Sequence, residues 1–170
     1  MPCDLTKSRS RVCFNTMGGN SKVYLNNFIE DPFTIVAGEA TAVNVGLTEC
    51  YGYELEGDNN TLEQVLTGDE NSGTSVCVQT LTLSLKAMSA ADNVEFSLLA
   101  SSMAQAVVKD RNGNYIALGD FDGMRWTITH AGGGAHGDFN GYTVVGVART
   151  NALGAILDSA TTTAYTALEV

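Results

Sequence analysis

Residues 75–88 alternate between apolar and polar side chains with the greatest regularity in the sequence. Leu81, Leu83 and Leu85 take every second position, and Thr80, Thr82, Ser84 and Lys86 take the positions that alternate with them. A period of two places alternate side chains on opposite faces of a β-strand, so this segment predicts a strand with one buried face. Such a strand needs neighbours in a sheet and a second layer over its apolar face, which favours a layered β fold.

A β-hairpin is predicted at residues 107–120. Asn112-Gly113 separates the apolar pair 107–108 from the mainly apolar run 115–118. Asn and Gly tolerate the positive φ that a tight hairpin turn needs. The tip is charged, as expected of an exposed turn, and carries Lys109, Asp110 and Arg111.

Most of the remaining sequence also predicts strands, because runs of β-branched and aromatic residues are separated by turn formers. These runs are residues 22–29, 33–37, 41–47, 50–57, 124–130 and 141–148. Many short strands with one helix predict a mainly β fold, a β-sandwich or barrel of antiparallel strands with one flanking α-helix.

The helix is predicted directly after the strand 75–88. Ser89 and Asp92 form a capping pair at its start. Its apolar face is expected to hold Val94, Leu98 and Leu99, which share one side at helical spacing.

A length of 170 residues predicts a single domain covering 1–170. Within it we expect an N-terminal arm at 1–21, a long acidic loop at 58–74 with at most a short helical turn at 61–66, and a C-terminal extension at 149–170. No apolar run approaches the roughly 20 residues of a membrane span, and the basic start is not followed by an apolar stretch. The chain is therefore expected in the cytoplasm of the cell that makes it.

The net charge of −10 is distributed unevenly. No Lys or Arg occurs from Val23 to Leu85, a stretch rich in Asp and Glu, whereas basic residues dominate the first 22 positions. A solvated acidic surface that confers solubility is the simpler interpretation. The alternative is a basic arm on one copy that contacts an acidic surface on the next. Tight nucleic-acid binding by the acidic middle is disfavoured, because phosphates would be repelled.

That alternative nominates charged residues as candidates for an interface between copies of the chain. They are Lys7, Arg9, Arg11, Glu54, Glu56, Asp58, Glu63, Asp69, Glu70, Lys109 and Arg111.

No catalytic, metal or cofactor site is predicted. His130, His136 and Asp138 are close in sequence, but glycines 132–134 leave them on a flexible connection, and metal ligands normally sit on rigid elements. The triple glycine lacks the Lys-Ser/Thr of a phosphate loop, and no Gly-x-Ser-x-Gly is present. The segment starting at Asp69 lacks the closing Glu of a calcium loop.

The cysteines and the single tryptophan are expected to be structural. Cys3, Cys13, Cys50 and Cys77 lack zinc-site spacing and are expected as buried or idle thiols, although a Cys3–Cys13 disulfide is possible if the protein leaves the cell. Trp126 could stack on a sugar or a base, but on a predicted strand it is expected in the core.

Four segments together resemble a group of bacteriophage virion proteins, tail tube subunits among them. They are MGGNSKVYLNNF near the start, QTLTLSL before the helix, VVKDRNGNYIALGDFDGMRW after it, and HGDFNGYTVVGVA near the end. The resemblance is an overall pattern of strands and turns. The C-terminal TNALGAILDSATTTAYTALEV departs from it, being longer and more apolar than expected after the last strand.

The resemblance implies a virion structural protein with no enzymatic activity. Its copies would form a homo-oligomeric ring, expected to be hexameric, and rings would stack into a hollow conduit for DNA ejection. The partners implied are further copies, other phage tail proteins, and genomic DNA that passes without sequence-specific binding. The protein would be made in the host bacterial cytoplasm and end in the viral tail.

Other functions stay open from the sequence. A tail terminator, a head–tail connector ring or a capsid decoration protein would have a similar composition. A carbohydrate-binding β-sandwich would need exposed aromatic residues, with Tyr51, Tyr53 and Trp126 as candidates. An enzyme would need the two histidines and Asp138 to bind a metal.

Overall fold

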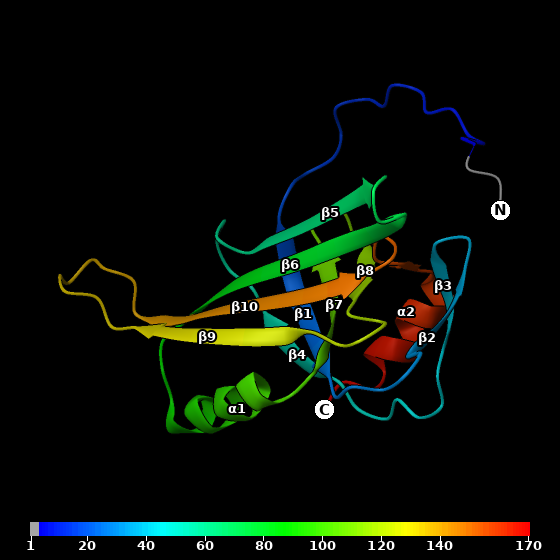
Figure 1. Cartoon of the computed structure of the whole chain (residues 1–170). Coiled ribbons are helices and arrows are strands. Elements are labelled where there is room, and N and C mark those ends of the chain that lie inside the picture. The colour runs from blue at the N-terminus through cyan, green and yellow to red at the C-terminus, as the bar shows by residue number, and fades with distance from the viewer. Residues whose placement is uncertain (1–3) are drawn as a thin grey trace.

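The fold consists of two β-sheets packed face to face, seen in a computed structural model that describes residues 4–170 (Figure 1). One sheet has the strand order β5-β6-β10-β9, formed by β5 (Thr61–Asp69), β6 (Thr74–Lys86), β9 (Arg125–Ala131) and β10 (Gly141–Thr150). The other has the order β2-β3-β11-β8-β7-β1-β4, formed by β1 (Asn20–Asn26), β2 (Phe33–Val36), β3 (Glu39–Val43), β4 (Tyr51–Glu54), β7 (Gln105–Asp110), β8 (Tyr115–Leu118) and β11 (Ile156–Leu157). All strand pairs are antiparallel except β3 with β11. The predicted mainly β, antiparallel architecture is confirmed.

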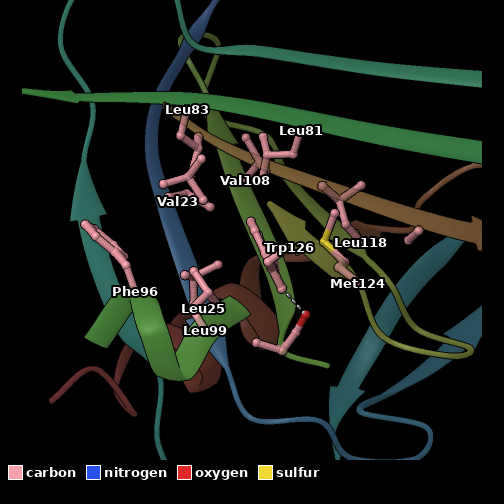
Figure 2. Close-up of a cluster of buried hydrophobic side chains, with 14 of the residues drawn as sticks. Val23, Leu25, Leu81, Leu83, Phe96, Leu99, Val108, Leu118, Met124 and Trp126 are labelled. Atoms are coloured by element: carbon pink, nitrogen blue, oxygen red, sulfur yellow. Dashed lines mark hydrogen bonds between the residues drawn. The ribbon is translucent and has the colours of Figure 1, made fainter. Parts of the chain in front are cut away.

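The main core lies between the two sheets (Figure 2). Leu81 and Leu83 of β6 are fully buried there, as the alternation predicted, and Val23 and Val108 lie in the same core. Trp126 is only 6 % exposed, and its indole N–H donates to the Ala104 carbonyl over 3.0 Å. A buried indole with its polar atom satisfied is a core residue, which confirms that prediction.

A second core lies on the other face of the seven-stranded sheet, under α2 (Ser159–Thr166). Asp158 caps this helix by accepting from the Thr161 amide. Tyr165 is fully buried, and its hydroxyl donates to Asn26 Oδ1 over 2.9 Å. The predicted C-terminal extension at 149–170 is part of the folded body, because this segment completes β10, adds β11 and covers the second core. The sequence predicted one helix, and the structure has a second one, α2.

The predicted helix is α1 (Ala90–Ser101), and Ser89 caps it by accepting from the Asp92 amide over 3.0 Å. Its predicted apolar face is wrong in part. Phe96 and Leu99 are buried, whereas Val94 and Leu98 are each 60 % exposed. Phe96 lies 4.7 Å from the Tyr142 ring, and burying this larger aromatic side chain turns the helix away from the predicted orientation.

The predicted acidic loop at 58–74 is wrong. Residues 61–69 form β5, which pairs with β6 along its whole length, so the helical turn expected at 61–66 is wrong as well. Leu62 and Gln64 face the interior while Thr61 and Glu63 face solvent, so the segment does have the alternation of a strand. Sparse apolar residues and Gly68 hid this pattern, as is common for an edge strand that buries little.

The N-terminal arm, residues 4–19 as described by the structure, precedes β1 and extends away from both sheets (Figure 1). The predicted hairpin is confirmed by β7 and β8, and Gly113 supplies the positive φ of 88° at its tip. Neither helix within residues 4–170 is long and apolar enough to cross a membrane.

Candidate assembly surfaces

The N-terminal arm carries apolar and basic side chains that the rest of the chain does not cover. Leu5 is 100 % exposed and Phe14 is 97 % exposed. The arm also holds the basic candidates Lys7, Arg9 and Arg11, all exposed. Exposed large apolar side chains on an extended segment are typical of a segment that is covered by a partner.

The arm leaves the body at a defined point. The Met17 amide donates to Asn112 Oδ1 over 2.9 Å, and Asn112 Nδ2 donates back to the Met17 carbonyl over 2.8 Å. The Arg111 amide also donates to the Gly19 carbonyl. The base of the arm is therefore fixed to the tip of the β7–β8 hairpin, which sets the direction in which the arm begins.

Two of the predicted interface residues pair with each other inside the chain. Arg111 donates to the Gly57 carbonyl over 3.0 Å, and its guanidinium lies 3.4 Å from Asp58. Lys109 lies over the Tyr115 ring, 5.6 Å from its centroid. Arg111 and Asp58 thus tie the hairpin tip to the segment before β5, although an exposed ion pair contributes little to stability.

The acidic candidates divide into paired and unpaired groups. Glu56 forms an ion pair with Lys86 at 2.9 Å, and this hydrogen bond lowers the pKa of Glu56. Asp69 accepts from the Asn71 amide and thereby closes the β5–β6 turn, which lowers its pKa. Glu54, Glu63 and Glu70 are exposed and lack an ion-pair partner within residues 4–170.

A groove of about 470 Å³ brings several candidates together at one end of the sandwich. Glu54, Glu56 and Lys109 line it, as do Lys22 and Lys86. Lys22 also bonds to Glu169 at 2.6 Å, a pair that no sequence pattern indicated, and this bond raises the pKa of Lys22. Acidic and basic groups alternate around the groove, so it does not favour a ligand of one charge.

The four-stranded sheet ends in two open edges, β5 and β9. Each edge strand has its outer backbone N–H and C=O groups unpaired within the described chain. Val65 and Leu66 on β5 are each 49 % exposed, and Thr127 and Thr129 on β9 are exposed. A long edge with exposed apolar residues is a template for pairing with another strand.

The histidine segment is arranged as a turn. Asp138 accepts from the Gly134 and Ala135 amides, each over 2.8 Å, and these bonds lower its pKa. Within residues 4–170 no group of three His, Cys, Asp or Glu side chains is placed to hold a metal ion.

The cysteines are also placed as structural residues. Cys50 and Cys77 are fully buried, and burial raises the pKa of Cys50 to about 11, which opposes nucleophilic reactivity. Cys13 is exposed, and the possible disulfide with Cys3 lies outside the described residues.

The aromatic residues proposed for carbohydrate binding do not form one surface. Trp126 is in the core, and Tyr53 is half-buried against Phe96. Tyr51 is 39 % exposed and bonds through its hydroxyl to Glu49. A single exposed tyrosine offers little area for stacking on a sugar ring.

One titratable residue was missed by sequence reasoning. Asp120 follows β8 beside a cavity of about 300 Å³, and its Oδ1 has no hydrogen-bond partner among the described residues. Burial, with a smaller contribution from the charge of Asp31, raises the pKa of Asp120 to about 6. Its sequence context, a Gly-Asp pair in a turn, gives no indication of burial.

Comparisons with protein-family models, with curated proteins and with solved structures find no match to this chain. The assignment of a function therefore depends on the arm, the sheet edges and the charges described above.

Proposed function

We propose that this protein is a structural subunit of a bacteriophage tail tube, a hollow conduit for DNA ejection. The observation that carries the proposal is the N-terminal arm, whose Leu5 and Phe14 are almost fully exposed although the body buries two hydrophobic cores. An arm of this kind is stabilised when it docks on another copy, and head-to-tail docking builds open filaments.

The sheet edges support the same proposal. Identical copies that pair edge to edge extend one sheet from subunit to subunit, and a ring results where the rotation closes. In a ring the edges are no longer exposed, which removes the hazard that a long edge strand otherwise presents.

Charge supports stacking between rings. The arm brings Lys7, Arg9 and Arg11, and the β5–β6 hairpin presents Glu63 and Glu70, which have no ion-pair partner within residues 4–170. We propose that the arm of one ring contacts the acidic hairpin of the next. The net charge of −10 would repel the phosphates of passing DNA and prevent adhesion to the wall.

The test is negative-stain electron microscopy of the full chain at stepwise higher concentration, together with light scattering. Hollow tubes of uniform width are expected. Closed rings that never lengthen would instead support a tail terminator or connector, and a persistent monomer would support a decoration protein. Either result would overturn the tube proposal.

The stacking contact has its own test. Replacing Lys7, Arg9 and Arg11 together by Glu should leave the fold intact by circular dichroism and prevent elongation. Replacing the same residues by Gln is the matched control, since it removes charge without reversing it and should weaken elongation less. Tubes of unchanged length from the Glu variant would contradict the charge contact.

A further inference from the structure

The two edges of the four-stranded sheet are complementary in strand direction. Each strand in the order β5-β6-β10-β9 is antiparallel to its neighbour, and the number of strands is even. If a second copy with the same orientation as the first is placed next to it, β5 of the second copy lies beside β9 of the first. The two strands are then antiparallel. Side-chain facing and hydrogen-bond alternation both continue across such a junction.

These edges pair poorly if the second copy simply extends the residue rows of the first sheet without any displacement along the strands. This arrangement is the straight register. Glu63 lies opposite Thr80, Thr80 opposite Val147, and Val147 opposite Arg125, so these four residues form one row across the sheet. Straight continuation would bring Glu63 of the next copy opposite Arg125. Most of β5 would then extend past the end of β9, because β9 begins at Arg125.

We infer that β9 of one copy pairs with β5 of a second copy in a register displaced by six residues, so that Asp69 lies opposite Arg125. This inference rests on the proposed assembly into rings and specifies its seam. All seven residues of β9 (Arg125–Ala131) then pair with residues 63–69 of β5. A displacement by an odd number would exchange the faces of every side chain and is excluded for that reason.

Two of the four outward-facing pairs in the seam are favourable, and the other two are Thr129 with Val65 and Ala131 with Glu63. Arg125 lies opposite Asp69, and Thr127 lies opposite Thr67. Opposite charges and threonine pairs directly across an antiparallel ladder are both favourable. In the straight register Thr127 would lie opposite Thr61.

On the side of the sheet that faces the core, a displacement of six residues pairs the side chains better than a displacement of four. At six residues the partly buried Ile128 lies opposite Leu66, which is 49 % exposed in the single chain. Gly68 then lies opposite Trp126, whose ring covers Gly146 of β10 and stays in the core. A displacement of four residues would place Ile128 opposite Gln64, an apolar side chain against an amide.

The displacement also has a geometric consequence. Four strands about 4.8 Å apart make a copy about 19 Å wide, and six residues at about 3.3 Å displace the next copy by about 20 Å. Strands in the closed ring would then tilt by about 45°, at the upper end of the range of about 35–45° typical of closed barrels. This tilt does not depend on the number of copies in the ring.

The seam is tested by cysteine cross-linking in the full chain with Cys3 and Cys13 replaced by Ser. Protein carrying Thr67→Cys is mixed with protein carrying Thr127→Cys and treated with a short thiol cross-linker. The mixture should give a covalent dimer, and either protein alone should not. Thr61→Cys with Thr127→Cys tests the straight register, and Thr80→Cys, from a central strand, controls for random collision.

The possible results test the seam and the tube proposal separately. Rings or tubes in the microscope without a dimer from the Thr67 and Thr127 pair would overturn the seam and leave the tube proposal standing. The expected dimer in a sample that forms only short oligomers would support the seam and overturn the tube. A larger yield from the Thr61 pair than from the Thr67 pair would overturn the displaced register.

Charge exchange gives a second readout. Arg125→Glu places like charges across the seam and should lower the dimer yield several-fold. Adding Asp69→Arg to the same chain restores opposite charges and should recover most of the yield. Circular dichroism of the unassembled protein checks that the chain carrying Asp69→Arg still folds. Failure of Arg125→Glu to change the yield would contradict the pairing of Arg125 with Asp69.

Discussion

The two ends of the chain treat their apolar residues in opposite ways. The C-terminal segment folds back, and Tyr165 becomes one of the largest fully buried side chains. The N-terminal arm extends away and leaves Leu5 and Phe14 exposed. Apolar residues near a terminus therefore serve two purposes in this molecule. One end completes the single subunit, and we propose that the other end docks on a second copy.

The largest expected effect concerns the packed end. Tyr165→Ala removes a fully buried ring that contacts the second core, and should lower the free energy of unfolding by about 3–5 kcal/mol. Tyr165→Phe is the control, since it removes only the hydrogen bond to Asn26 and should cost about 1 kcal/mol. Urea unfolding followed by tyrosine and tryptophan fluorescence measures both. Equal losses for the two variants would contradict the packing role of the ring.

The contrast between the ends also shows what sequence can predict. The strict alternation of β6 and the Asn-Gly turn of the β7–β8 hairpin were recognised because their periodicity or turn chemistry is strong and local. The β5 edge strand was missed because it buries one side weakly. The helix α2 was missed because Ser159–Thr166 consists of Ser, Ala and Thr around one Tyr, without an apolar stripe.

The candidate surface was predicted in composition but not in pairing. The separation of a basic arm from acidic residues is visible in the sequence. That Asp58 pairs with Arg111, and Glu56 with Lys86, depends on long-range folding that charge counting does not capture. The same holds for Asp120, whose burial comes from the packing of loops that are distant in sequence.

The second-largest expected change in stability concerns Asp120. This residue lines a cavity that is also lined by residues 150–155 of the packed C-terminal end. Its folded pKa of about 6 is raised above the ordinary Asp value, so the folded state binds the proton more tightly than the unfolded state. The stabilisation that the protonated Asp120 carboxyl gives to the folded state is fully present below about pH 4. It is lost as the pH rises through about 6. Asp120→Asn should therefore stabilise the protein at pH 7 to 8 by about 1–3 kcal/mol.

Urea midpoints between pH 4 and 8 test this sign. The variant should gain stability over the wild type as the pH rises, and the difference should nearly vanish near pH 4. Asp122→Asn, at an exposed neighbouring position, is the matched control and should show no such gain. A destabilised Asp120→Asn at pH 8 would contradict burial as the cause of the raised pKa.

The unpacked end, the N-terminal arm, is expected to add little to the stability of the subunit. Removal of residues 1–16 keeps the Met17–Asn112 contacts, and the side chains described in that segment, at 4–16, are all exposed. Stability should therefore change by less than about 0.5 kcal/mol, as for surface residues in general. Elongation should be lost, as followed by light scattering. A large loss of stability would show that the arm packs on its own subunit, and the contrast between the two ends would fail.

The smallest expected effect lies where the two ends meet. Lys22, at the start of β1, bonds to Glu169 near the C-terminus at 2.6 Å, with both side chains partly exposed. Glu169→Gln should lower stability by about 0.5 kcal/mol at neutral pH. The bond to Glu169 raises the pKa of Lys22, so this contribution is present below about pH 10 and is lost as the pH rises through the raised value.

The control for this pair is Glu56→Gln, which breaks the more exposed pair with Lys86 and should leave the urea midpoint unchanged. Glu169→Gln is expected to lower stability more than Glu56→Gln does, and salt should reduce this difference. That result would show that the last residues of the chain hold the first strand electrostatically. Equal, negligible losses would mean that the burial of Tyr165 and the uncharged hydrogen bonds of this segment keep the C-terminal end in place. The packed end would then need no ion pair, which would sharpen its contrast with the charged and exposed arm.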